Sequence, residues 1–405
     1  PRRAEVDAVL RLLDERIASL PAETVVLEDA IDRVLSADVT APCAVPGFDR
    51  AAMDGYALRG AETFGADAYS PLDFEVVGLS LPGRPCGATV REGEAVRIMT
   101  GAPLPAGADA VVPAENATEE TRGGKRLVRV TEAASPGRHV GRIGEDIQAG
   151  TVLLKTGRRL RPQDLGVLAS VGAAPIAVIR RPSAAILVSG DELLPAGARP
   201  AGYQIVDSNS IMLRALLRRD GVDTVRVEMV RDGAEPIRRA LAESTEDVVL
   251  VSGGSSVGQE DHAPRILAEL GELAAHGVAL RPASPTGIGF LGGRPVFLLP
   301  GNPVSCLCAY DLFAGRAVRR LGGRATKLPY AVVRAPLERK IVSMVGRVDY
   351  VRVKVGEGRV EPLAISGASI LSSTTRADGF VLVPADAEGY AEGTPIEVYL
   401  YDRDV

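Results

Sequence analysis

The spacing of apolar residues changes along the chain, and each change indicates a different kind of structure. In "AEVDAVLRLLDERIASL", residues 4–20, apolar side chains recur every three or four positions and Pro21 ends the pattern, which predicts an amphipathic helix. From residue 39 to about 150, short runs such as "FEVVGLS" and "RLVRVTE" are separated by glycine and proline, which predicts a β-rich module. Residues 151–180 add a strand-like "TVLLKTG" and a helical "QDLGVLASVG".

From residue 183 the pattern alternates between strands and helices. The apolar runs "AAILVSG", "TVRVEMV", "DVVLVSGG" and "PVFLLPG" alternate with the helical stretches 209–220, 235–244, 263–270 and 303–321. Continuous apolar strands separated by helices predict a parallel sheet covered on both faces, with ligands bound at the carboxyl ends of the strands. After residue 323, "RVDYVRVKV" and "GFVLVP" return to β texture, which predicts a small β-barrel or sandwich.

Polar residues follow each of the four apolar runs, where a parallel sheet would bring them to one edge. Carboxylates beside a loop of glycine and serine suit a phosphorylated ligand, because backbone N–H groups hold oxyanions and acids hold Mg²⁺. Each acid taken singly also fits a helix cap or a solvated loop charge. The candidate residues, in chain order, are Asp191, Glu192, Asp232, Gly253, Gly254, Ser255, Ser256, Gly258, Glu260, Asp261, Asn302 and Ser305.

The turn "PGNP" lies directly before the last of these helical stretches. Gly301 permits a sharp reversal that a residue with a Cβ would resist. Asn302 suits an N-cap and Pro303 the first helical position. With Pro300 preceding them, these residues predict a helix N-terminus whose backbone donors face outward, which is an anion-binding geometry. An ordinary capped βα turn is the alternative.

Three glycine-rich segments of the β-rich module carry polar residues at their tips. They are "PGFDRAAMDGYALRG" at 46–60, "RIMTGAPLPAGADAVVP" at 97–113 and "GRIGEDIQAG" at 141–150. Plain turns and proline-stiffened loops also explain such segments. They contain no visible pair of nucleophile and base, so covalent catalysis has no support in the sequence.

Composition narrows the classes of function. The chain has 405 residues, 46% of them hydrophobic and 24% charged, which is typical of a globular protein with two to four domains. A net charge of −5 disfavours nucleic acid and anionic membranes as partners. No apolar run approaches membrane-spanning length and no signal-peptide pattern opens the chain, so we expect a cytoplasmic protein.

The four cysteines and three histidines do not form a recognisable site. Cys43, Cys86, Cys306 and Cys308 lack metal-knuckle spacing, so neither a zinc site nor a disulfide framework is expected. The last two stand two positions apart, and on a helix they would point to different faces.

Several segments together resemble the molybdopterin molybdenumtransferases, the family that includes the E-domain of gephyrin. The segments are "FDRAAMDGYAL", "RIMTGAPLPAGADAVV", "GEDIQAG", "LVSGDELL", "DSNSIMLRALL", "DVVLVSGGSSVGQEDH" and "LLPGNPVS", in the family's order between residues 46 and 305. The resemblance implies Mg²⁺-dependent hydrolysis of adenylyl-molybdopterin with insertion of molybdate into the dithiolene, giving molybdenum cofactor and AMP. It also implies a homodimer, with other proteins of molybdenum cofactor biosynthesis as further candidate partners.

The resemblance further implies an α/β multidomain fold of four parts. A molybdopterin-binding α/β domain with a parallel sheet would comprise 1–21 and 180–325, and a small linking domain 22–40 and 151–179. A β-rich domain would comprise 41–150 and a C-terminal β-barrel 326–405. The active cleft would lie between the α/β domain of one subunit and the β-rich domain of the other.

Carried over by motif, the resemblance assigns site residues. Asp54, Thr100 and Asp146 match the wall supplied by the second subunit. Glu192, Asp232 and Asp261 match the acids of the α/β edge and the expected Mg²⁺ ligands. The residues expected to bind the pterin, phosphate or oxyanion are Gly253, Gly254, Ser255, Ser256, Arg281, Pro300, Gly301, Asn302, Pro303, Ser305 and Arg347.

One segment departs from the family pattern. Where the family often has Met-Lys-Pro-Gly-Lys-Pro, residues 280–285 read "LRPASP". Arg281 keeps one cation but Ser284 removes the second, so either Ser305 and an arginine such as Arg347 or Arg352 compensate, or molybdate binds more weakly.

Two other functions stay open at this point, a non-catalytic scaffold or molybdopterin carrier of the gephyrin type and an adenylyl transferase that binds the same pterin. Converging acids favour catalysis over a scaffold, and the adenylyl transferase would be expected to carry its own Gly-Ser-Gly loop. The sequence does not distinguish molybdate from tungstate as the substrate.

Overall fold

The computed structural model describes residues 3–254, 262–364 and 367–402. The chain divides into two compact units. The α/β unit comprises Pro1–Glu23, Asp32–Ser36 and Val178–Val405, and the β-rich unit comprises Thr24–Ile31 and Ala37–Ala177. The division falls within β1 (Ala22–Val25) and β12 (Ile176–Ile179).

The α/β unit contains a six-stranded sheet in the order β16-β13-β17-β21-β20-β18. The four predicted apolar runs form its parallel part, with Ile186 of β13 in register with Val227 of β16 and Leu250 of β17. These strands are β13 (Ala184–Ser189), β16 (Val225–Val230), β17 (Val248–Ser252) and β21 (Arg294–Leu299).

The prediction of an all-parallel sheet is wrong at one edge. There, β18 (Glu272–His276) and β20 (Gly287–Leu291) run antiparallel to their neighbours. Leu291 pairs with Arg294, so only Gly292 and Gly293, with φ 58° and 82°, connect β20 to β21. Two glycines with positive φ are the usual signal of a tight hairpin, and the sequence analysis did not use it.

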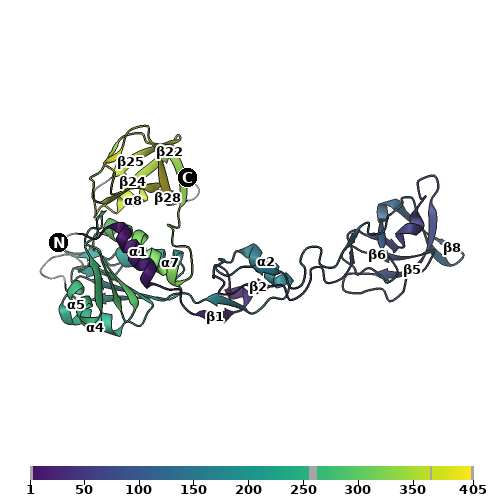
Figure 1. The fold of residues 1–405 in the computed structure, drawn as a ribbon, viewed down its shortest axis with the longest axis horizontal. Helices are drawn as coiled ribbons and strands as arrows, with labels where there is room; N and C mark the ends of the chain where they lie inside the picture. The colour runs from purple at the N-terminus through teal and green to yellow at the C-terminus, as the bar shows by residue number, and fades with distance from the viewer. Residues whose placement is uncertain (1–2, 255–261, 365–366, 403–405) are drawn as a thin grey trace. The chain divides into compact units, whose positions relative to one another are not determined.

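Helices cover both faces of this sheet (Figure 1). Along β13, Ala184, Ile186 and Val188 pack into one core while Ala185 and Leu187 pack into the other, as the two-residue period of a strand requires. The first face carries α1 (Val6–Arg16), α3 (Asn209–Arg219), α6 (Pro303–Ala309) and α7 (Gly315–Leu321), and the second carries α4 (Ala234–Glu243) and α5 (Ala263–Leu270).

The predicted helix at 303–321 is interrupted in the middle. A π-helical turn, η4 (Tyr310–Ala314), separates α6 from α7. Every residue of this turn is buried. Such turns hold one residue more than a regular α-helical turn.

The C-terminal strands form a second sheet of the α/β unit, in the order β19-β24-β26-β28-β22 with β25 beside β24. β19 (Leu280–Arg281) joins this sheet by parallel pairing with β24. The closed barrel expected here stays a prediction. The other elements are β22 (Ala331–Pro336), β23 (Ile341–Val342), β24 (Val348–Gly356), β25 (Arg359–Ala364), α8 (Ser372–Thr375), β26 (Gly379–Val383), β27 (Gly389–Tyr390) and β28 (Pro395–Leu400).

A buried carboxylate connects the π-helical turn to the C-terminal sheet. Asp311 is 0% exposed and accepts hydrogen bonds from the hydroxyls of Tyr330 (2.9 Å) and Tyr350 (3.2 Å). It also accepts one from Arg219 Nη2 at 3.2 Å, at the end of α3. Burial raises the pKa of Asp311, and the Arg219 guanidinium opposes that change. Tyr350 stacks on Phe380 with ring centroids 4.0 Å apart, so the polar contacts lie within an aromatic cluster.

The β-rich unit contains a six-stranded sheet in the order β7-β4-β6-β5-β9-β8. Two short pairings, β10 with β3 and β11 with β2, lie outside this sheet. The predicted domain boundaries at 22, 41, 151, 180 and 326 stay predictions. The elements of the unit are η1 (Leu27–Asp29), β2 (Val39–Thr40), β3 (Arg50–Ala51), β4 (Gly55–Leu58), η2 (Gly60–Thr63), β5 (Leu72–Ser80), β6 (Glu94–Ile98), β7 (Ala110–Pro113), η3 (Ala114–Asn116), β8 (Ala117–Arg122), β9 (Lys125–Val130), β10 (Val140–Gly141), β11 (Val152–Leu154) and α2 (Pro162–Ser170).

We expect Asp311→Asn to reduce the free energy of unfolding of the α/β unit by about 2–4 kcal/mol, because it removes the fully buried partner of the half-buried Arg219. Asp14→Asn is the matched control: it breaks the ion pair with Arg316 at a partly exposed position, where a loss below about 1 kcal/mol is expected. Urea unfolding followed by circular dichroism measures both. Equal losses in the two variants would show that the Asp311 contacts do not stabilise the fold.

Candidate functional site

A cavity of about 710 Å³ lies where the parallel strands of the α/β unit end. The loops after all four parallel strands contribute to its lining, which confirms that their polar residues share one edge of the sheet. The predicted site residues that line it are Glu192, Asp232, Gly253, Gly254, Pro300, Gly301, Asn302 and Pro303. Ser255, Ser256, Gly258, Glu260 and Asp261 lie outside the described residues.

Two carboxylates face this cavity in different ways. Asp232 accepts hydrogen bonds from Ser189 Oγ (2.7 Å) and from the Asp191 backbone N–H (3.1 Å), while its own N–H donates to Asp191 Oδ1 (3.2 Å). These reciprocal bonds hold the loops after β13 and β16 together. Among the described residues, the Glu192 carboxylate has no hydrogen-bond or ion-pair partner, so it is available to a ligand.

This pair of acids fits Mg²⁺ better than a metal that needs a full protein cage. In the described part of the chain, no three His, Cys, Asp or Glu side chains are grouped to hold a metal ion. Mg²⁺ is commonly held by one or two carboxylates, with water and substrate phosphate filling the other positions. Glu192 and Asp232 match that pattern.

Two backbone segments lie close together at Gly253, directly after β17. Gly253 has φ 92°, and a Cβ there would lie 2.3 Å from the carbonyl oxygen of Ser189, so only glycine fits. The prediction that position 301 needs a glycine, because a Cβ would resist the turn there, is wrong. Its φ is not in the left-handed region, and a Cβ there would meet only Gly253 Cα at 3.7 Å.

The structure of the turn before α6 confirms part of what the sequence "PGNP" predicts. Asn302 is the N-cap residue and Pro303 is the first helical residue, but the Asn302 side chain makes no capping bond. The expectation of outward-facing backbone donors is wrong for Val304, whose N–H donates to Ala368 O at 3.0 Å. Ser305 is 3% exposed and does not line the cavity.

The sequence analysis missed Asn209, the first residue of α3. Its Nδ2 donates to Ser252 Oγ (2.9 Å) and to the carbonyl oxygen of Gly301 (2.8 Å), so it ties together the ends of β17 and β21. Because a carbonyl can only accept, the amide orientation is fixed and Oδ1 is left buried without a partner. The signal was the polar "DSNS" directly before a helical stretch, to which no role was assigned.

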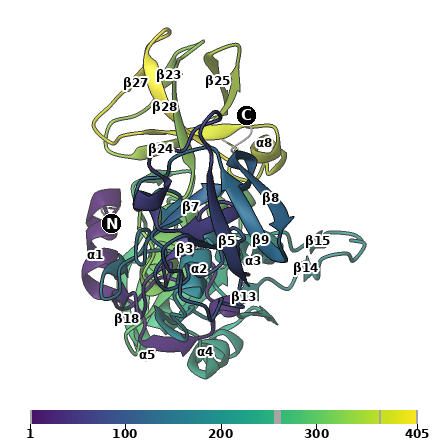
Figure 2. The ribbon, with the colours of Figure 1, turned by 90° about the vertical axis from the view of Figure 1, so that its right-hand side faces the viewer.

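A projecting loop begins and ends at the cavity. It runs between β14 (Leu193–Leu194) and β15 (Ile205–Val206), which pair in parallel (Figure 2). Of the four residues in these two strands, all but Leu194 line the cavity. Tyr203, within the loop, is fully exposed.

The predicted arginines lie at the junction of β19 and the C-terminal strands rather than in the cavity lining. Arg281 Nε donates to Asp349 Oδ1 at 2.8 Å, and Arg347 Nε lies 3.5 Å from the same oxygen. Arg352, the other arginine expected to compensate for Ser284, is 0% exposed, so that expectation is wrong for this residue. Ala283 has φ 98°, a conformation that favours glycine, the residue that the family pattern carries there.

The three glycine-rich segments of the β-rich unit lie together. Gly101 N–H donates to Ala51 O (2.8 Å), and Ala51 pairs with Val140 just before the third segment. The backbone N–H and Oγ1 of Thr100 both donate to Asp54 Oδ1, at 2.7 and 2.6 Å, and lower the pKa of Asp54. Asp146 is exposed on the third segment, so all three predicted residues belong to one cluster of loops.

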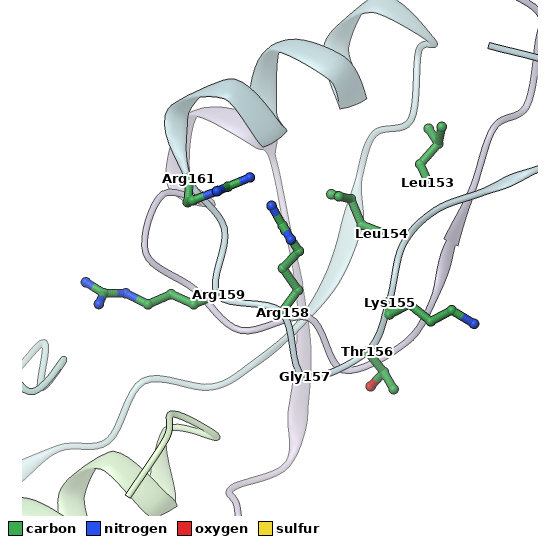
Figure 3. A pocket seen from close by; sticks show the side chains of 8 residues that line it. All are labelled: Leu153, Leu154, Lys155, Thr156, Gly157, Arg158, Arg159 and Arg161. Atoms are coloured by element: carbon green, nitrogen blue, oxygen red, sulfur yellow. The ribbon is translucent and has the colours of Figure 1, made fainter. Parts of the chain in front are cut away.

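A second hollow in the β-rich unit is lined by residues 153–161 (Figure 3). It is basic, but Lys155 and Arg159 extend in opposite directions. Arg158 and Arg161 both bond Asp164, and the Arg158 contact lowers the pKa of Asp164. Two cations of this hollow are thus bonded to Asp164 and the other two point apart, so the four do not converge on a bound anion.

The two cysteines of α6 lack the accessible thiol that a nucleophile needs. Cys306 and Cys308 are both buried, and the expectation that they point to different faces of the helix stays a prediction. Burial raises the pKa of Cys306 to about 12 and that of Cys308 well above its ordinary value.

Among the helices of the described chain, none has the length and apolar character needed to cross a bilayer.

Three protein-family profiles match the chain. Residues 4–172 match "MoeA N-terminal region (domain I and II)", residues 185–320 match "Probable molybdopterin binding domain" and residues 334–401 match "MoeA C-terminal region (domain IV)". The cavity lies within the second region and extends to Ser369 of the third. The fold and the site therefore define a multidomain protein of the MoeA type, built around an α/β domain.

Relatives that align with nearly the whole chain identify the family within this class of protein. The chain is 34% identical to molybdopterin molybdenumtransferase 2 of Mycobacterium tuberculosis, covering 96% of this chain and 97% of that one. It is 30% identical to the molybdopterin molybdenumtransferase of Staphylococcus aureus, covering 98% and 95%. A molybdopterin biosynthesis MoeA protein from Pyrococcus horikoshii superposes with a TM-score of 0.85 at 32% identity, covering 99% and 100%. The chain belongs to the molybdopterin molybdenumtransferase family and is a transferase of molybdenum cofactor biosynthesis.

Gly253 and Gly301 lie close together, so alanine substitutions at the two positions test which of them needs a glycine. We expect Gly253→Ala to weaken binding of AMP at least tenfold, because the added methyl group must push β17 away from Ser189. Gly301→Ala should change binding less than about twofold, since its Cβ makes an ordinary contact. Isothermal titration with AMP and Mg²⁺ measures both. A Gly301→Ala variant as damaged as Gly253→Ala would restore the sequence-based prediction.

Proposed function

We propose that this protein inserts molybdate into the dithiolene of adenylyl-molybdopterin, with Mg²⁺-dependent release of AMP, giving molybdenum cofactor. The observation that carries the proposal is the cavity at the carboxyl ends of four parallel strands, where two carboxylates and two backbone turns line one space in a chain of this family. We also expect the cytoplasm as its location.

The cavity residues divide into two roles. Gly253 and Gly254 would bring backbone close to the ligand, since their φ values of 92° and 57° favour glycine, which has no side chain. Glu192 and Asp232 would hold Mg²⁺, with Asp261 as a third candidate from the family pattern. When bound, Mg²⁺ neutralises phosphate charge during cleavage of the phosphoanhydride.

Asn209 and Asp232 keep these groups in position. Asn209 fixes Ser252 against Gly301 by its two donated bonds, and Asp232 fixes the loop that carries Glu192 through Ser189 and the Asp191 backbone. Groups held before the ligand arrives lose little freedom on binding.

The oxyanion is proposed to bind near Arg281 and Arg347, with Ser305 as a further candidate. A tetrahedral dianion suits guanidinium forks. Ser284 supplies no charge where the family pattern has its second lysine, so a molybdate affinity below that of lysine-containing relatives is expected. Tungstate has the same charge and shape and is an alternative substrate.

The β-rich residues are proposed to act from the second subunit of a homodimer. Asp54 and Thr100 support this because their mutual bonds leave Asp54 Oδ2 outside the contact, at an exposed position. Asp146 lies on the neighbouring loop. Other proteins of molybdenum cofactor biosynthesis are further candidate partners.

A non-catalytic scaffold or molybdopterin carrier is the alternative function. The free carboxylate of Glu192 inside the cavity favours catalysis, because a scaffold gains nothing from an acid that bonds no described residue. AMP release separates the two: an enzyme releases AMP from adenylyl-molybdopterin, and a carrier binds it unchanged.

We expect Glu192→Gln to lower the rate of AMP release at least a hundredfold while leaving the fold intact, because the amide keeps the shape of the side chain but removes the charge that attracts Mg²⁺. Glu243→Gln, at the exposed end of α4, is the control and should retain the parent rate. Purified protein is mixed with adenylyl-molybdopterin, Mg²⁺ and either molybdate or tungstate, and AMP is quantified. A near-parent rate for Glu192→Gln would contradict the assigned role.

Composite sites make a separate prediction. If each cleft uses Glu192 from one subunit and Asp54 from the other, mixed dimers of Asp54→Ala and Glu192→Gln chains contain one cleft without either lesion. Such dimers should regain up to about half of the parent activity per dimer. Verified mixed dimers without recovery would place both residues in a single-subunit site.

A further inference from the structure

We infer that Asp349 is a positioning residue that holds Arg281 and Arg347 in place for the oxyanion. The inference rests on the proposed function and adds to it a residue that neither the sequence motifs nor the resemblance assigns. Asp349 is 0% exposed, so it does not itself contact a ligand in the described structure.

The geometry around this carboxylate is closely determined. Arg281 donates from Nε at 2.8 Å and from Nη2 to the two different oxygens of Asp349, which is a bidentate pair. Ser343 Oγ donates to Oδ2 at 2.6 Å. Arg347 Nε lies 3.5 Å from Oδ1, so one buried acid faces two guanidinium groups.

The backbone supports the same arrangement. Arg281 is in parallel register with Asp349 where β19 pairs with β24, and Val348 N–H donates to Ala279 O at 2.8 Å beside this pair. Arg281 comes from the region that matches the molybdopterin-binding profile, while Arg347 and Asp349 come from the C-terminal region. The carboxylate therefore joins cations from two regions of the α/β unit.

Each arginine keeps an outward-facing part. The Arg281 and Arg347 side chains are 29% and 23% exposed. Asp349 bonds Nε and Nη2 of Arg281 and forms an ion pair with Nε of Arg347, which leaves Arg281 Nη1 and the Arg347 terminal nitrogens without a contact to Asp349. Two arginines and one aspartate give a net charge of +1, which attracts a tetrahedral dianion such as molybdate.

Asp349 has two opposing effects on anion binding. Its negative charge weakens the attraction, but water and salt screen that term because the outer ends of both arginines are exposed. Its two hydrogen bonds from Arg281 and its ion pair with Arg347 restrict the rotamers that these long side chains would otherwise sample, and without Asp349 that loss of freedom would have to occur on binding. We therefore expect the positioning effect to be the larger one.

The test compares Asp349→Asn with Ser343→Ala. Asp349→Asn keeps the shape and loses the charge-assisted fork, so half-saturating molybdate for AMP release should rise about tenfold. Half-saturating adenylyl-molybdopterin and the rate at saturating molybdate should stay within about twofold of the parent, which a general structural defect would not spare. Ser343→Ala removes one bond to the same carboxylate without touching either arginine and should change neither constant by more than about twofold.

Two further measurements keep the inference testable. Molybdate binding by equilibrium dialysis with metal analysis gives the same comparison without turnover, so failure of the proposed reaction would not hide it. If circular dichroism shows Asp349→Asn to be unfolded, Arg281→Lys replaces it, because lysine keeps the charge and loses the fork; molybdate binding should again weaken. Unchanged or tighter molybdate binding in a folded variant would overturn the positioning role.

Discussion

The contacts of Asp311 determine how the two sheets of the α/β unit are joined. One carboxylate in the π-helical turn bonds Arg219 from α3, Tyr330 before β22 and Tyr350 from β24. A charge in a fully buried position is stable only when such donors surround it. Because Tyr350 is adjacent to Asp349 in β24, the same contact fixes the strand that carries the acid between the two arginines. The location of the oxyanion-binding candidates thus depends on a residue far from any ligand.

A close backbone contact and one buried side chain define the floor of the cavity. Gly253 brings the end of β17 against β13, and Asn209 holds β17 against the turn after β21. The acids then stand on loops that are already fixed. This division explains why the site combines residues of two kinds: those that shape the space and those, such as Glu192, that remain free within it.

Periodicity predicted the elements of the α/β unit well, because its strands are apolar on both faces and its helices bury one face. It failed where a distant contact decides the outcome. Gly301 and Gly253 look equivalent in sequence, and only the folded chain distinguishes them, by the positive φ of Gly253 and the approach of Ser189. The engaged N–H of Val304 likewise depends on Ala368, which lies more than sixty residues away. The antiparallel edge was predictable from "GG" between two apolar runs, a local signal that was not used.

The π-helical turn at 310–314 contains one residue more than a regular α-helical turn. Removing a single residue from it would therefore leave one continuous α-helix, with α6 and α7 in nearly the same orientation. Removing a residue from α7 ahead of Arg319 would instead rotate the side chains beyond it by about 100°, and Arg319, which now donates to Asp220 at 3.0 Å inside the core, would leave its partner. The length of α7 is therefore more strongly constrained than the length of the turn that precedes it.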